Sequence, residues 1–129
     1  MMAMSKIFPE PIRSLPEADI PLNGVKAYLS QSLNHQILFM EFKEDVELPE
    51  HLHDSQWSVV LEGRIDLVVE SVKYTYSKGD HYFIRKGERH SGKIYAGYAD
   101  ITFFNQKDQC KMKNGKNAEK MKEDRGDKE

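Results

Sequence analysis

The chain has 129 residues, and its 19 Lys plus Arg against 21 Asp plus Glu give a formal net charge of −2. This length predicts one domain, and the balanced charge lacks the basic surface of a nucleic-acid-binding protein. No apolar run approaches the roughly 18 residues of a transmembrane helix, and the N-terminus lacks the layout of a signal peptide. Cys110 is the only cysteine, so it cannot form a disulfide within the chain. Without an export signal, a basic surface or an apolar span, we expect a cytoplasmic protein with neither membrane nor nucleic-acid partners.

Residues 1–21 are predicted to form an extended N-terminal arm. They contain four of the five prolines, and proline fixes φ and removes a backbone donor, which disfavours regular helices and central strands. The apolar side chains of Ile7, Phe8, Ile12 and Leu15 could dock on the body of the protein or on a partner subunit.

Residues 22–104 are predicted to form the folded domain from many short strands. Apolar and polar side chains alternate over 25–29 and 65–69, and an apolar run over 37–42 has the length of a strand. Strands at this spacing, separated by glycine-containing turns, are typical of an all-β sandwich or barrel. A core from so few residues is small, so we expect a homodimer rather than a monomer.

Alternation leaves one strand with two possible inward faces. Either Met40 and Phe42 or Phe39 and Glu41 could line the interior, because residues of one parity share a face. Trp57 is expected to pack on the outside of the domain or at an interface.

Residues 105–129 change in character. Fourteen of these 25 residues are charged and none is aromatic. Such a segment buries too little apolar surface to offset its ordering entropy, so we predict a polar, disordered tail.

Three of the five histidines fall in two short motifs. His51 and His53 stand two residues apart at a predicted strand end, so their imidazoles can aim the same way, and His90 follows a later turn. Imidazole binds zinc, nickel, iron and copper, so a metal site is one reading and solvated histidines the other. The remaining two histidines, His35 and His81, are expected to be structural or at the surface.

The first motif resembles that of the cupin family. Cupins carry HxH, an acidic residue a few positions later, then six residues and a glycine. This chain has His51, His53, Gln56 and Gly63 in that order, but with a shorter gap before Gln56 and with glutamine in place of the usual glutamate.

The second motif resembles the other cupin signature, in which glycine, proline, glycine and histidine recur at fixed spacing. Gly79, Gly87 and His90 agree with it, and Arg85 stands in the place of the proline. Over residues 35–104 the resemblance implies a single all-β cupin barrel, also called a double-stranded β-helix or jelly roll. It further implies a metal on the histidines of both motifs, and Arg85 becomes the best candidate to bind an anion near the barrel mouth.

Gln56 is predicted as a fourth ligand through its amide oxygen. Three neutral imidazoles and an amide leave the charge of a divalent ion uncompensated, which favours Zn, Ni, Fe or Cu over Mn. An anionic substrate or hydroxide could supply the missing charge. Alternatively Gln56 does not ligate, and the site is a three-histidine site with open positions.

The resemblance implies a small oxygen-bearing metabolite as ligand but leaves its fate open. A dioxygenase-type reaction and an isomerase- or decarboxylase-type reaction are the enzymatic alternatives, with Tyr82 as a candidate catalytic acid or simply a packed core tyrosine. The non-catalytic alternatives are a small-molecule-binding sensor or carrier and a purely structural barrel.

Overall fold

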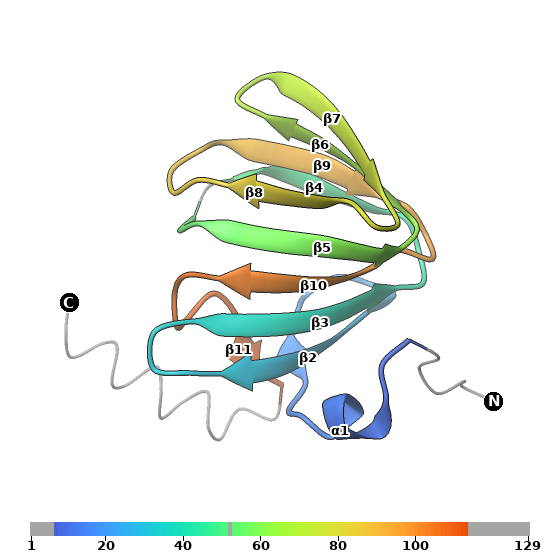
Figure 1. Ribbon diagram of the computed structural model, residues 1–129, viewed down its shortest axis with the longest axis vertical. Coiled ribbons are helices and arrows are strands. Elements are labelled where there is room, and N and C mark those ends of the chain that lie inside the picture. The colour runs from blue at the N-terminus through green and yellow to red at the C-terminus, as the bar shows by residue number, and fades with distance from the viewer. Residues whose placement is uncertain (1–6, 52, 114–129) are drawn as a thin grey trace.

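The computed structural model describes residues 7–51 and 53–113, which build two large antiparallel sheets around a common core and one small two-stranded sheet (Figure 1). The five-stranded sheet has the order β2 (Val25–Gln31), β3 (Gln36–Phe42), β10 (Ala99–Phe104), β5 (Gln56–Glu62), β8 (His81–Ile84). The four-stranded sheet has the order β4 (Val46–His51), β9 (His90–Ile94), β6 (Arg64–Val69), β7 (Val72–Ser77). The predicted all-β jelly roll is confirmed. Within the described residues, no helix has the length and apolarity needed to span a membrane.

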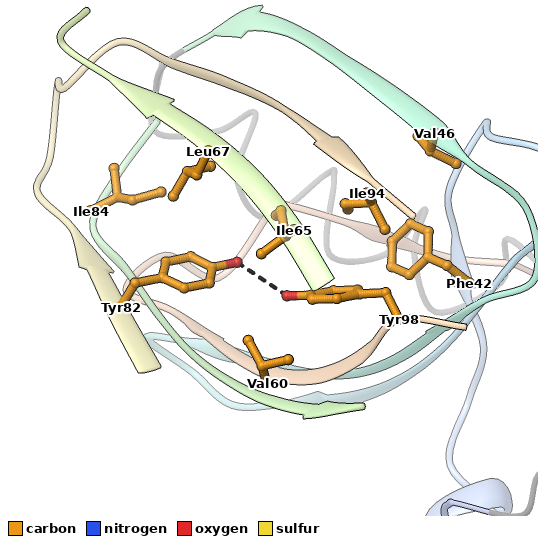
Figure 2. Close-up of a cluster of buried hydrophobic side chains, with 9 residues drawn as sticks. All are labelled: Phe42, Val46, Val60, Ile65, Leu67, Tyr82, Ile84, Ile94 and Tyr98. Carbon is orange, nitrogen blue, oxygen red and sulfur yellow. Dashed lines mark hydrogen bonds between the residues drawn. The ribbon is translucent and has the colours of Figure 1, made fainter. Parts of the chain in front are cut away.

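The main core lies between the two sheets (Figure 2). Its buried members come from both sheets and from the β9–β10 connection: Phe42, Val46, Val60, Ile65, Leu67, Tyr82, Ile84, Ile94 and Tyr98. The inward face of β3 carries Leu38, Met40 and Phe42, while Phe39 lies on the opposite face and contacts the Phe8 ring. Of the two sets of side chains that the sequence left open for this strand, Met40 and Phe42 therefore face the interior.

The turn between β5 and β6 requires glycine. Gly63 has a φ of +78°, and a Cβ placed there would lie 2.6 Å from the backbone Cα of Tyr98. Both the left-handed conformation and the close backbone approach exclude a larger side chain. This contact fixes the position of the loop that carries Tyr98 into the core.

The N-terminal arm docks on the outer face of the five-stranded sheet through Phe8. The Phe8 side chain is 3% exposed, and its ring packs edge-to-face against Tyr28 and Phe39. The arm also forms a single helical turn, α1 (Glu10–Arg13), with a proline in its first turn, where the missing N–H is harmless. Residues 1–6 of the predicted arm lie outside the described residues.

Part of the predicted tail is ordered. The strand β11 (Lys111–Met112) pairs with β1 (Ala18–Asp19), and the side chains of Cys110 and Met112 pack against a second, smaller core. Residues 105–113 thus differ from the expected disordered tail, because a few apolar side chains and a pairing strand offset the polar composition. Residues 114–129 lie outside the described residues.

A buried glutamine anchors this segment. Gln36 is fully buried; its Nε2 donates to the Cys110 carbonyl at 2.8 Å, and its Oε1 accepts from the Cys110 N–H at 2.9 Å. Burial also raises the pKa of the Cys110 thiol to about 11, so Cys110 is a packing residue.

Replacing Gln36 by alanine should lower the free energy of unfolding by about 3 kcal/mol, because the Cys110 backbone groups lose their partners and a cavity opens. Urea titration followed by tryptophan fluorescence measures this loss. The matched control is Gln109→Ala, which truncates a half-buried glutamine in the same segment. Equal unfolding midpoints for the two variants would contradict the anchoring role.

Candidate metal centre

The structure brings the two histidine motifs together at one end of the barrel. His51 ends β4 and is the register partner of His90, which begins the neighbouring strand β9. His53 lies in the connection that leads from β4 to β5 in the other sheet. One ring nitrogen from each of the three imidazoles lies within 4.8 Å of the others.

A β-bulge turns His51 toward the interior. The register of β4 against β9 shifts between Leu48 and His51, so one extra residue is accommodated there. Leu48 faces the interior, and without the shift His51 would have the opposite parity. Bulges commonly redirect side chains beside functional sites, and Pro49 is tolerated here because bulges need fewer backbone donors.

Each of the three imidazoles is oriented by a backbone carbonyl. The Nδ1–H groups of His51, His53 and His90 donate to the carbonyls of Pro49, Asp54 and Glu88 at 2.7, 2.6 and 3.0 Å. A carbonyl only accepts hydrogen bonds, so Nδ1 carries the proton and Nε2 presents a lone pair. Metal-binding histidines are typically oriented in this way.

The imidazoles of the half-buried His53 and the buried His90 bring their Nε2 atoms close together. Nε2 of His53 lies 3.1 Å from Nε2 of His90, although neither carries a proton to share in this tautomer. Two nitrogens at about 2.1 Å from one ion are separated by about 3.0 Å in octahedral and about 3.4 Å in tetrahedral geometry. The spacing therefore fits a cation held between these nitrogens.

The surroundings of His53 and His90 favour their neutral form. Burial lowers the pKa of His53 and of His90, and the neighbouring imidazole of His51 lowers both further. Neutral imidazole is the form that binds a metal. His90 is 4% exposed, whereas His51 is exposed to solvent, so the site lies at the edge of the barrel interior.

The second motif supports the first through its turn. The Gly87 N–H donates to the His53 carbonyl at 3.1 Å, and Gly87 has a φ of +80°, which glycine adopts without strain. The turn thus fixes the backbone of His53 and, one residue later, presents the Glu88 carbonyl to His90.

Gln56 borders the same cavity as the three histidines. Its Nε2 donates to the Ser58 hydroxyl at 3.1 Å, and that hydroxyl lies 2.7 Å from the Thr102 hydroxyl. The amide nitrogen is thereby occupied, which leaves the amide oxygen as the atom that could ligate. Ligation by Gln56 stays a prediction.

A cavity of about 270 Å³ extends from the imidazoles into the barrel. Its walls are mostly apolar, with Met40 and Phe42 among them, and Ile20 of the arm and Cys110 of the C-terminal segment also border it. Small-molecule sites typically begin near 300 Å³, so this volume suits a small metabolite.

Sequence reasoning missed a buried carboxyl group in this cavity. Asp100 borders the cavity and is 2% exposed; the Tyr98 hydroxyl donates to its Oδ2 at 2.6 Å. Burial raises the pKa of Asp100 to about 7, although the Tyr98 and Thr102 hydroxyls favour the anion. The signal was present in the sequence: Asp100 continues the inward alternation of Thr102 and Phe104, one position before the expected strand start.

Tyr82 faces the interior, as expected for a cavity residue. Its hydroxyl lies 3.3 Å from that of Tyr98 (Figure 2). Burial, with the charge of Asp100, raises the pKa of Tyr82 well above its usual value, so its hydroxyl stays protonated. A catalytic role for Tyr82 stays a prediction.

The other candidates lie outside the cavity. Arg85 is exposed and is not among the cavity-lining residues. Trp57 is 41% exposed on the outer face of the five-stranded sheet, and His35 stacks on Phe103. His81 is exposed.

Comparisons with known proteins identify a family model and solved structures that are similar to this chain. The family model described as "Cupin domain" matches residues 38–97. No curated protein sequence matches the chain. Among solved structures, an RmlC-like cupin from Shewanella frigidimarina is 21% identical with a TM-score of 0.65, covering 84% of this chain and 97% of that one.

Two enzymes of known reaction are also similar in structure. A variant of oxalate decarboxylase from Bacillus subtilis is 16% identical with a TM-score of 0.63, covering 74% of this chain and 28% of the enzyme. Salicylate 1,2-dioxygenase from Pseudoaminobacter salicylatoxidans, with gentisate, is 15% identical with a TM-score of 0.58, covering 67% and 26%. At these identities the similarity shows the fold.

Proposed function

The chain carries a domain of the cupin superfamily, and on that premise we propose that it is a metal-binding cupin acting on a small oxygen-bearing metabolite. The observation that supports the proposal most strongly is the cluster of three imidazoles whose ring nitrogens lie within 4.8 Å of one another, with each Nδ1 hydrogen-bonded to a backbone carbonyl. Zn, Ni, Fe and Cu suit this neutral nitrogen-rich set better than Mn.

The metal would be held by His51, His53 and His90, with Gln56 as the proposed fourth ligand. When bound, it would supply Lewis-acid polarisation of a ligand oxygen or, if redox-active, oxygen chemistry. The chain's own contribution is the apolar cavity, which excludes water from the molecule bound beside the imidazoles. Isomerase- or decarboxylase-type and dioxygenase-type reactions remain the enzymatic candidates, and both a decarboxylase and a dioxygenase share the fold.

A non-catalytic binding protein is the second candidate. It is favoured by the mostly apolar cavity, whose walls include the N-terminal arm and the C-terminal segment, as expected for a site that retains its ligand. The two candidates differ in what happens to the ligand: an enzyme releases a changed molecule, whereas a sensor or carrier releases the same one.

The experiment that separates the candidates starts from elemental analysis of the untagged full chain. The protein is then loaded with one metal at a time and incubated with mixed small oxo and hydroxy acids, while oxygen uptake and the product spectrum are recorded. Oxygen uptake supports the dioxygenase type, oxygen-independent conversion supports the isomerase or decarboxylase type, and stoichiometric recovery of an unchanged ligand supports the binding protein. Absence of any metal after reconstitution would contradict both enzymatic candidates and the metal site, and would leave a protein that binds its ligand by shape and hydrogen bonds.

Exchanging Gln56 for glutamate should be tolerated and should shift metal preference toward harder ions, with the Mn-to-Zn affinity ratio rising about tenfold, because a carboxylate adds the missing negative charge. Competition titrations with a chromophoric chelator measure the ratio. Gln106→Glu, which adds the same charge outside the cavity, is the control. An unchanged ratio in Gln56→Glu would show that Gln56 is not a ligand.

The cytoplasmic location and the homodimer stay predictions. Sedimentation velocity of the full chain would decide between monomer and dimer.

A further inference from the structure

The deep part of the cavity contains a carboxyl group that the metal site does not use. Asp100 is 2% exposed, and among the described residues its Oδ1 is a buried side-chain oxygen without a hydrogen-bond partner. Its other oxygen, Oδ2, accepts from Tyr98. Buried polar atoms are nearly always paired, so an unpaired carboxyl oxygen at a cavity wall indicates a place for a donor.

The cavity offers Asp100 no cation. Within residues 7–51 and 53–113, no lysine or arginine lines it, and the other titratable lining groups are Asp19, Tyr82, Cys110 and the three histidines of the proposed metal site. A carboxyl group without a counter-charge is costly to bury and is best stabilised by hydrogen-bond donors. The Tyr98 hydroxyl donates to Oδ2 and the Thr102 hydroxyl also favours the anion, while Oδ1 can accept a further hydrogen bond.

The two polar ends of the cavity lie on the same pair of strands. Gln56 and Phe104 are register partners at the imidazole end, and Val60 and Asp100 are register partners deeper in the barrel. Four residues of strand separate these levels by about 13 Å at the backbone. The two ends are therefore far enough apart to be bound by different groups of one elongated molecule.

We propose that Asp100 is a second ligand-recognition group, whose Oδ1 accepts a hydrogen bond from a hydroxyl group of the molecule bound at the imidazoles. This inference rests on the proposed function, because it takes the imidazole end as the site of an anionic oxygen group. The ligand class that fits both ends is a small hydroxy acid, with its carboxylate at the neutral metal site and its hydroxyl several carbons away.

The charges at the two ends of the cavity support this orientation of the ligand. The metal ligands carry no negative charge, so the carboxylate of the ligand belongs at the imidazole end, where it offsets the charge of the ion. Asp100 would repel a carboxylate but accepts a hydroxyl, which donates a hydrogen bond. Its pKa, raised to about 7, leaves a substantial anionic fraction near neutral pH, and a hydroxyl donor favours that form.

The test compares matched probes that differ only in the hydroxyl. Dissociation constants are measured by calorimetry on the zinc-loaded full chain for ω-hydroxy carboxylates of four to seven carbons and for the unsubstituted acids. The hydroxyl should improve affinity about tenfold at one optimal length, because a site with a buried acceptor discriminates against analogues that lack the donor. Since each pair shares the same carboxylate, the ratio reports on the deep end alone.

Variants of Asp100 decide the assignment. The hydroxyl advantage should fall severalfold in Asp100→Asn and vanish in Asp100→Val, while both keep one zinc per chain; if Asp100→Val fails to fold, the isosteric Asp100→Asn still gives the answer. An advantage unchanged in Asp100→Asn would overturn the inference, as would the lack of an advantage at every length in wild-type protein with zinc bound. Loss of zinc binding in the wild type would instead contradict the proposed function.

Discussion

Replacing His90 by alanine should remove stoichiometric metal binding and with it the stabilisation that metal confers. His90 is the most buried of the three imidazoles, and its Nε2 faces that of His53 at 3.1 Å, so two remaining ligands cannot enclose an ion. With zinc at a hundred times its dissociation constant, wild-type protein should gain about 2.7 kcal/mol, which corresponds to roughly 10 °C in Tm. The variant should gain almost nothing. Thermal unfolding with and without zinc, beside elemental analysis, measures both effects.

Two further variants serve as controls for protein stability and for the position of the metal. His51→Ala removes an exposed ligand and should lose metal with little effect on the unfolding of the metal-free protein. His81→Ala removes an exposed histidine outside the site and should keep both the metal and the shift in Tm. A zinc-dependent shift of equal size in His90→Ala and His81→Ala would place the metal elsewhere.

Short-range rules predicted an all-β domain from the sequence, and the resemblance to the cupin motifs predicted the barrel and three of the candidate site's side chains. Period-two alternation and the glycine turns suffice for an all-β domain. The motifs then identified His51, His53 and His90, which the structure brings together. What alternation alone could not supply is the bulge after Leu48, which inverts the parity of β4 and turns His51 inward. A bulge depends on pairing between strands, and pairing is not a local property of the chain.

The ordered C-terminal segment and the buried carboxyl depend on tertiary contacts. Composition alone favours disorder for residues 105–113, but Gln36, distant in sequence, holds Cys110 by two hydrogen bonds. From the sequence alone, the last strand is expected to begin at the apolar Ile101, which leaves Asp100 in the preceding loop. Its burial follows from the pairing of β10 with both β3 and β5, which places it in the centre of the sheet.

Exchanging Asp100 for asparagine should make the metal-free protein more stable than wild type at pH 8 but not at pH 5. Burial raises the pKa of Asp100 from 3.8 to about 7, and the groups that face it are the uncharged hydroxyls of Tyr98, Thr102 and, farther away, Tyr82. Between about pH 4 and pH 7 the folded state holds a proton that the unfolded chain has released. Wild-type stability therefore falls as pH rises through this window, by at most about 1.4 kcal/mol per pH unit.

Asparagine has nearly the shape of the protonated carboxyl and does not titrate, so its curve lacks this fall. The difference in unfolding free energy between Asp100→Asn and wild type should grow by a few kcal/mol from pH 5 to pH 8. Urea titrations at both values measure it, and Asp80→Asn, at an exposed aspartate, should show no such growth. Parallel curves for wild type and Asp100→Asn would mean that Asp100 is ionised in the folded state throughout this range. In that case its unpaired oxygen would need a donor even in the absence of ligand.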